Sequence, residues 1–322
     1  MRRKTPALPY VMWMVIFIAV PLLLVVFFAL TAPAAQDGAA GDALATAYDD
    51  YESDAESNGD YDDADGEDAD AEGAADTEGA ADGGGVVWTL DNISRVGQFA
   101  PALMRSIVLA SVATLICLAV GYPVSYIISR GAGSVQRTLL MLTLLPMWMN
   151  FLLRTYAWMT LLEKNGLINR FLGLFGIGPL NMINTSGAVV LGMVYNYIPF
   201  MILPLFSVMA KIDTTAVEAA RDLGADASKV FTRIILPLSM PGVMSGVTMV
   251  FVPAVSTFII SRMLGGGGNL LIGDLIDLQF LGNAYNPNLG AAISLLLMVM
   301  ILLCMSIFNQ FGSEEEMEGA LL

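Results

Sequence analysis

The stretch EAARDLGADASKVFTRIILP, residues 218–237, decides how the rest of the chain is interpreted. It is crowded with charged side chains, whereas the chain of 322 residues that surrounds it is 56% hydrophobic. Just upstream, Thr215 and Glu218 have the spacing of a capping box, and Asp213 is a competing cap for the same helix. The pattern therefore predicts that a short helix begins here.

A second helix is expected in the same stretch. Gly224 suits the left-handed conformation that ends a helix, and Asp226 can start the next one. Pro237 and Pro241 are expected to interrupt that second helix where the chain returns to apolar sequence. We therefore predict a short helix–turn–helix within residues 213–237.

The two faces of the first helix differ in character. One predicted face is apolar and consists mostly of small residues: Ala216, Val217, Ala220, Leu223 and Gly224. The other face is polar and carries Thr215, Glu218, Arg221 and Asp222. A helix that lies on lipid normally presents Leu, Phe and Trp. The small residues therefore favour close docking to a partner protein over contact with the membrane surface.

Six apolar runs occupy much of the remaining chain, at 10–31, 103–129, 139–162, 187–209, 242–263 and 288–311. A helix needs about 20 such residues to cross a bilayer, so we expect an all-α integral membrane protein with six transmembrane helices. The distribution of basic residues places both termini and residues 213–237 on the cytoplasmic side. Because basic residues precede the first run, a cleaved signal peptide is the alternative for that run.

Residues 36–85 form an acidic, low-complexity insert after the first run. They contain 18 Asp and Glu and no Lys or Arg, so the net charge of −15 becomes −15 + 18 = +3 for the rest of the chain. Such a composition cannot bury enough apolar surface to order itself, and we expect a disordered extracytoplasmic linker. The alternative is a local electrostatic collector of cations. Residues 1–35 are then a cytoplasmic tip with the first span, and 312–322 a short acidic cytoplasmic tail.

Catalytic chemistry has little support in this sequence. There is no histidine, and the two cysteines, Cys117 and Cys304, lie inside predicted spans. We therefore predict no metal site, no cofactor and no catalytic residue. The glycines at 265–268 lack the lysine of a phosphate-binding loop and are interpreted as a flexible turn outside the membrane. A membrane sensor or enzyme with an ion-binding acidic segment is the rival hypothesis, but it needs a constellation that is not found.

Polar and aromatic side chains inside predicted spans are candidate functional residues. The substrate-path candidates are Trp148, Asn150, Tyr156, Tyr195, Asn196 and Tyr197. Their aromatic rings can hold ammonium groups by cation–π attraction, and the alternative for Tyr156 and Trp158 is an aromatic belt at the lipid interface. Arg154 is expected to pair with a carboxylate of this chain or of a partner.

Two carboxylates complete the set of candidates. Asp274 and Asp277 are spaced to share one face of a helix. Near the outer mouth of the predicted pathway they can receive a polyvalent cation, or one of them can simply pair with Arg262. Both alternatives stay open at the level of sequence.

The charged stretch resembles the EAA loop of ABC importer permeases. The matching anchors are Glu218, Ala219, Ala220, Gly224, Ile234, Leu236 and Pro237. Other segments, among them WTLDNISRV (88–96), LLPMWMNFLLRTYAW (144–158) and GGGGNLLIGDLIDLQFL (265–281), are similar to the spermidine/putrescine importer permeases. The resemblance covers roughly residues 86–311. The acidic insert and Arg262 depart from that family's pattern.

The resemblance implies a type I importer fold in a bacterial inner membrane. It implies that the EAA anchors couple this chain to a cytoplasmic ATPase, and that the chain forms half of a pathway for a polyamine. The implied partners are a second permease subunit, two ATPase subunits that bind the ATP, an extracytoplasmic binding protein and membrane lipid, with no nucleic acid. The alternative within transport is the same machinery for another small solute, for example an anion attracted by Arg154 and Arg262.

Overall fold

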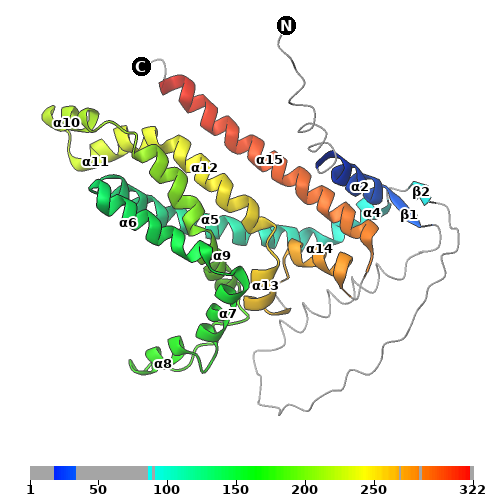
Figure 1. Ribbon diagram of the computed structural model, residues 1–322. Helices are drawn as coiled ribbons and strands as arrows, with labels where there is room; N and C mark the ends of the chain where they lie inside the picture. The colour runs from blue at the N-terminus through cyan, green and yellow to red at the C-terminus, as the bar shows by residue number, and fades with distance from the viewer. Residues whose placement is uncertain (1–17, 34–85, 89–90, 268–269, 283–284, 320–322) are drawn as a thin grey trace, which may run out of the picture. The chain divides into compact units, whose positions relative to one another are not determined.

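The computed structural model describes residues 18–33, 86–88, 91–267, 270–282 and 285–319 (Figure 1). They belong to two compact units, one of Phe99–Asp277 with Ser294–Leu322 and one of Met1–Gln98 with Leu278–Ile293. The predicted acidic insert, 36–85, and most of the cytoplasmic tip lie outside the described residues. Those two predictions therefore stay predictions.

The smaller unit contains a short two-stranded ribbon. Strand β1 (Thr31–Pro33) pairs in antiparallel register with β2 (Val86–Trp88), which places Pro33 opposite Val86. Helix α2 (Val20–Ala29) precedes the ribbon, and α4 (Asp91–Arg95) follows it and leads into the 3₁₀ turn η3 (Val96–Phe99). The buried Asn92 side chain donates to the Thr31 carbonyl at 3.0 Å. The expected all-α fold thus has one small β element.

Three long helices form the core of the larger unit. These are α5 (Ala100–Ser129), α9 (Ser186–Met209) and α12 (Leu236–Val255), which pack against one another (Figure 1). Their contact depends on small residues, as is usual where membrane helices approach closely. A Cβ added at Gly246 of α12 would lie 2.7 Å from the Met201 sulfur of α9. A larger residue at this position would force the Met201 side chain to move and would crowd the Met201 carbonyl, which lies 3.3 Å from the added Cβ.

Polar side chains connect the same three helices. The Tyr122 hydroxyl of α5 lies 2.8 Å from the Ser239 hydroxyl of α12. Ser125 of α5 donates to the Ile202 carbonyl of α9 at 3.1 Å. Hydrogen bonds of this kind hold membrane helices together where no water competes for the polar groups. They fix the register of α5 against both of its neighbours.

The predicted span at 139–162 is not one straight helix. Helix α6 (Gly133–Leu144) continues through the 3₁₀ turn η4 (Leu145–Trp148), and α7 (Phe151–Leu162) is followed by α8 (Leu167–Gly173). The two halves, Gly133–Trp148 and Phe151–Gly173, meet at 90°. Pro146 lies in the first turn of η4 and Asn150 caps α7, so the helical hydrogen bonding restarts at this point.

The predicted span at 242–263 also needs a correction. The span expected at 242–263 ends at Val255, and residues 259–264 form a separate short helix, α13 (Ile259–Leu264). After α13 come α14 (Ile272–Leu281) and the long helix α15 (Pro287–Gly319), which continues into the predicted tail.

The described residues contain four helices long and apolar enough to span a membrane, or five if the bent pair counts as one span. Of the first predicted run, 10–31, the structure describes only the part that includes α2. The total of six spans therefore stays a prediction. Both cysteines lie within candidate spans, as expected.

Candidate functional site

The charged stretch folds into the predicted pair of short helices. Helix α10 (Thr214–Asp222) and α11 (Ala227–Val230) project at one end of α9 and α12 (Figure 1). The backbone N–H of Thr215 donates to Asp213 Oδ1 at 2.9 Å, so Asp213 is the cap and the expected Thr215 capping box is wrong. Hydrogen bonds from Thr215 lower the pKa of Asp213. This cap is therefore charged at neutral pH, where a negative charge suits a helix N-terminus.

The turn between the two helices follows the prediction. Gly224 has a φ of +82°, and its N–H donates to the Arg221 carbonyl at 2.9 Å. The N–H of Ala225 donates to the Ala220 carbonyl at 3.0 Å, which completes the hydrogen bonds that close the helix end. Asp226 caps α11 by accepting the N–H of Lys229 at 2.9 Å. Local sequence signals are sufficient to form this turn.

The prolines do not interrupt the second helix as expected. Instead, a π-helical turn, η5 (Phe231–Ile235), joins α11 to α12. Pro237 lies in the first turn of α12, and Pro241 lies inside it. Residues 227–255 form one continuous helical segment, and Pro237 has no N–H to donate to the turn before it, which is the π-helical turn. The break in regular geometry therefore precedes the prolines.

Part of the apolar face of α10 packs on its own chain. Val217 is buried in the core cluster that includes Met209 and Val230, and Ala220 is half-buried against the same cluster. The prediction that the whole face docks a partner is therefore wrong for Val217, whereas the docking of Ala220 stays a prediction. Leu223 points the other way and is 88% exposed. What the hairpin offers to a partner is its tip, together with the exposed Glu218, Ala219 and Gly224.

The remaining anchors of the EAA pattern lie at the base of the hairpin. Ile234 and Leu236 are half-buried and Pro237 is exposed. Ile235 between them is buried in the core cluster. The anchors thus divide into residues that attach the hairpin to the bundle and residues that face away from it. We call α10, α11 and the turn between them the coupling hairpin.

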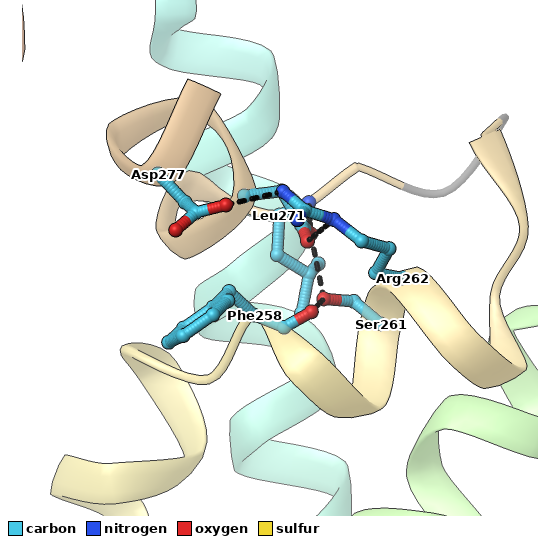
Figure 2. A network of polar contacts seen from close by, with 6 residues as sticks. Phe258, Ser261, Arg262, Leu271 and Asp277 are labelled. Carbon is cyan, nitrogen blue, oxygen red and sulfur yellow. Dashed lines mark hydrogen bonds and ion pairs between the residues drawn. The ribbon is translucent and has the colours of Figure 1, made fainter. Parts of the chain in front are cut away.

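A second polar site lies between α13 and α14 (Figure 2). Asp274 is fully buried, and its Oδ2 accepts the Ser261 hydroxyl at 2.6 Å and the Leu271 N–H at 2.8 Å. Its Oδ1 has no hydrogen-bond partner among the described residues and lies 4.0 Å from Arg262 Nε. The start of α14 is held in turn by Ser106 of α5, whose hydroxyl accepts the Ile272 N–H at 2.8 Å. Ser106 and Ser261 carried no recognisable sequence signal.

The environment of Asp274 shifts its ionisation towards higher pH. The residue lies on α14, which is not one of the candidate spans. Burial raises the pKa of Asp274 from 3.8 to about 6, although the Ser261 and Leu271 hydrogen bonds and the Arg262 charge act in the opposite direction. Desolvation therefore outweighs the groups that stabilise the carboxylate. Because it is buried, Asp274 does not present its charge to a passing cation in this structure.

Asp277 has a different role from Asp274. Arg262 Nη2 donates to Asp277 Oδ2 at 2.6 Å, and Figure 2 shows the arginine of α13 reaching across to the carboxylate of α14. The Arg262 side chain is 47% exposed and that of Asp277 17%. The structure therefore contains the Arg262 pair that the sequence left as one of two alternatives. The neighbouring Gly265 ends α13 by donating to the Ser261 carbonyl at 2.7 Å.

The aromatic candidates of the bent segment are accessible. Trp148 is 91% exposed, and Tyr156 is also exposed. Asn150 is exposed but already has a structural task, because its Oδ1 accepts the Leu152 N–H at 2.8 Å and caps α7. These side chains do not converge on one binding site in the described structure.

The candidate residues on α9 all contact other groups of the folded chain. Tyr195 meets Trp158 edge-to-face with ring centroids 5.3 Å apart. Asn196 is buried and donates to the Gly192 carbonyl at 2.9 Å, while its Oδ1 has no partner. The Tyr197 hydroxyl donates to the Pro253 carbonyl of α12 at 3.3 Å. Three consecutive residues therefore serve three different contacts, as the helical period requires.

Arg154 does not have the carboxylate partner expected from the sequence among the described residues. The side chain is buried, and its Nε and Nη1 have no hydrogen-bond partner. The guanidinium lies 5.9 Å from the centre of the Phe151 ring, which supplies a weak cation–π contact. The expected carboxylate is not found among the described residues of this chain.

The fold and these sites define a polytopic helical membrane protein with a projecting helical hairpin. Residues 88–312 match the family described as the binding-protein-dependent transport system inner membrane component. The chain belongs to this family, whose members are transport components and not enzymes.

Two curated relatives are similar over most of their length. The spermidine/putrescine transport system permease protein PotB of Escherichia coli (strain K12) is 39% identical over 227 residues, which cover 69% of this chain and 82% of the relative. PotB of Haemophilus influenzae (strain ATCC 51907 / DSM 11121 / KW20 / Rd) is 39% identical over 224 residues, covering 68% and 78%.

Among solved structures, a bacterial ABC transporter involved in the import of the acidic polysaccharide alginate has the same fold. Its TM-score is 0.65 at 13% identity, covering 95% of this chain and 93% of that one. At this identity the likeness supports the fold and says nothing about the cargo.

Proposed function

We propose that this chain is a permease subunit of an ABC importer for a polyamine, spermidine or putrescine. The observation that carries the proposal is the 39% identity to PotB over 227 residues. The chain would form half of the pathway, with a second permease subunit forming the other half. An extracytoplasmic binding protein would deliver the solute, and both termini would be cytoplasmic.

We further propose that the coupling hairpin docks onto a cytoplasmic ATPase. The hairpin is built from local caps and rests on the bundle through Val217 and Val230. A movement of the hairpin would therefore be passed to α9 and α12. Two ATPase subunits would bind the ATP, and this chain would need no cofactor of its own.

The accessible candidates suggest where a polyamine meets the chain. An ammonium group that leaves water needs a carboxylate or an aromatic face in exchange. We propose the exposed Trp148 and Tyr156 for the aromatic contacts and Asp277 for the carboxylate, with the half-buried Tyr195 as a further aromatic contact. Asp274, Asn196 and Tyr197 would stabilise the helices around the pathway without contacting the polyamine, because each side chain already forms a hydrogen bond within the chain.

Uptake by the reconstituted importer tests this proposal. The full complex, with its second permease subunit, ATPase subunits and binding protein, is placed in liposomes that contain ATP. We expect ATP-dependent accumulation of labelled putrescine or spermidine, and none without the binding protein. Uptake of an unrelated solute with no polyamine uptake would contradict the cargo but leave the importer. Failure of the chain to assemble with any ATPase would contradict the importer itself.

An anionic solute is the second candidate, and Arg154 is the observation that favours it. Within the described residues the Nε and Nη1 nitrogens of the buried guanidinium have no hydrogen-bond partners, and the oxygens of an anionic solute would accept from them. The same liposomes distinguish the candidates. If the cargo is an anion, they will accumulate a labelled small dicarboxylate and not a labelled diamine.

A further inference from the structure

The loop after α7 presents an apolar surface. Residues 167–180, which we call the α8 loop, consist of α8 and the turns that follow it. Six large apolar side chains of this loop are exposed: Leu167, Phe171, Leu174, Phe175, Ile177 and Leu180. Leu174 at the centre is 81% exposed. In water, side chains of this kind would collapse onto one another or onto the bundle.

Hydrogen bonds of one buried side chain close the base of the loop. Asn169 is buried, and its Nδ2 donates to the carbonyls of Glu163 at 3.1 Å and Leu180 at 2.9 Å. The Leu180 N–H returns a hydrogen bond to Asn169 Oδ1 at 2.9 Å. All hydrogen-bonding groups of this amide except one lone pair are thereby used. The base of the loop is closed, so its apolar surface is a property of the folded chain.

The direction of the loop relative to the spans suggests what covers it. Helix α6 contacts the span α5, and α7 with α8 turns away from α6 at 90° (Figure 1). A segment at right angles to a membrane-crossing helix runs along the membrane plane. Figure 1 shows α7 and α8 below the end of α9 that lies away from the coupling hairpin. This direction suits a segment that lies along a surface of the bilayer.

The charges of the segment fit a phospholipid surface. Lys164 and Arg170 are exposed and lie among the apolar side chains in sequence, whereas Glu163 is the only acidic residue between 163 and 180. Basic side chains beside an apolar surface are typical of segments that lie at the boundary between headgroups and acyl chains. Leu152 and Leu153 in the first turn of α7 are also exposed.

We infer that the α8 loop is an interfacial anchor, which lies in the membrane surface opposite the coupling hairpin with its apolar side chains in the headgroup–acyl boundary and Lys164 and Arg170 against lipid phosphates. The anchor would fix the outward end of the bent span while the hairpin end moves. This inference does not depend on the cargo, so it can fail or hold separately from the polyamine proposal.

Site-directed spin labelling tests the anchor in the full chain. The native cysteines are replaced (Cys117→Ala, Cys304→Ala), and single labels are introduced by Leu174→Cys or Phe175→Cys. The chain is placed in nanodiscs of phosphatidylethanolamine and phosphatidylglycerol, and collision rates with oxygen and with a water-soluble nickel complex are measured. We expect oxygen to collide more often than nickel at both sites, since oxygen partitions into lipid.

Two reference labels make the result quantitative. Leu115→Cys, on the exposed apolar side of α5, reports lipid, and Leu223→Cys, at the hairpin tip, reports water. Labels at Leu174 and Phe175 that match Leu223 would overturn the anchor. Repeating the measurement with the complete importer adds one more outcome: if lipid contact is absent and both reagents are excluded only after the binding protein is added, the surface docks a protein and the anchor is wrong.

Discussion

Arg262 Nη2 lies 2.6 Å from Asp277 Oδ2 and ties α13 to α14 in the larger unit. The pair matters because the same arginine is the closest cation to the buried Asp274, at 4.0 Å. Reversing the charge at Arg262 would therefore place three carboxylates together, and reversing the charge at Asp277 would place two arginines beside one carboxylate. The pair is better tested by exchanging its charges than by removing them.

We expect Arg262→Asp and Asp277→Arg each to lower the thermal stability of the purified chain, and the double exchange to recover most of the loss. A partly exposed pair gives a coupling energy of about 1 kcal/mol in a double-mutant cycle. Unfolding in detergent, followed by the midpoint temperature, measures it. If the double exchange is as unstable as the sum of the single changes, the pair does not hold α13 to α14.

Asp277→Asn distinguishes contact with the cargo from a purely structural pair. If Asp277 meets an ammonium group, the concentration for half-maximal polyamine uptake should rise severalfold while ATPase assembly stays unchanged. If the pair is only structural, stability should fall, the uptake curve should keep its midpoint, and Arg262→Gln should restore the stability. Unchanged stability and an unchanged curve would exclude both roles.

Asp274 should make the stability of the chain depend on pH. Its pKa in the folded protein is about 6 against an ordinary 3.8, so the folded state binds the proton more tightly than the unfolded state. By linkage, stability should fall as the pH rises from about 4 to about 6, and the full cost of the buried charge should remain above that range. Asp274→Asn should flatten this part of the profile. The exposed Asp222→Asn is the control and should leave the slope in place.

Gly224→Val should disturb the coupling hairpin through its backbone alone. The added Cβ meets no atom within 4 Å, but φ is +82°, a conformation that costs a β-branched residue about 1–3 kcal/mol. We expect normal membrane insertion with loss of ATPase co-purification and uptake. Gly133→Val is the matched control, since its Cβ also meets open space and its φ is not positive. Full uptake by the Gly224 variant would mean that the hairpin does not couple the subunits.

Leu223→Ser tests the exposed tip of the hairpin. The side chain is 88% exposed, so its removal should leave stability nearly unchanged. If the tip enters a groove of the ATPase, co-purification should fall at least tenfold. Leu281→Ser provides a control at another leucine that is 83% exposed. Equal effects of the two changes on ATPase binding would remove the tip from the interface.

The acidic segment should be replaceable by a two-residue turn. Pro33 and Val86 are already paired across the β1–β2 ribbon, so Asn-Gly in place of residues 34–85 would close an ordinary hairpin. We expect intact folding and assembly. Because residues 36–85 carry 18 acidic side chains, uptake of a cation at low ionic strength should slow modestly. A chain that no longer assembles would show that the segment is structural.

Features that depend on neighbouring residues in the chain were predictable from the sequence. The left-handed Gly224 and the Asp226 cap of the coupling hairpin follow from backbone preferences that act over a few residues. Most of the long apolar helices, such as α5 and α9, follow from the cost of leaving apolar side chains and backbone groups in the wrong solvent. These are local or solvent-driven effects, and they need no knowledge of the fold.

Only the tertiary structure decided which of the candidate side chains remain accessible to a partner or a solute. Val217 was predicted to belong to a docking face but is buried in the chain's own core cluster. Asp274 was predicted either to receive a cation or to pair with Arg262, but it is buried and accepts hydrogen bonds from Ser261 and the Leu271 N–H. The sequence could not show this, because Ser261 and Asp274 meet only after α13 and α14 have folded back on each other. A side chain's charge, exposure and hydrogen bonds are set by the segments packed around it, and those segments are chosen by the fold as a whole.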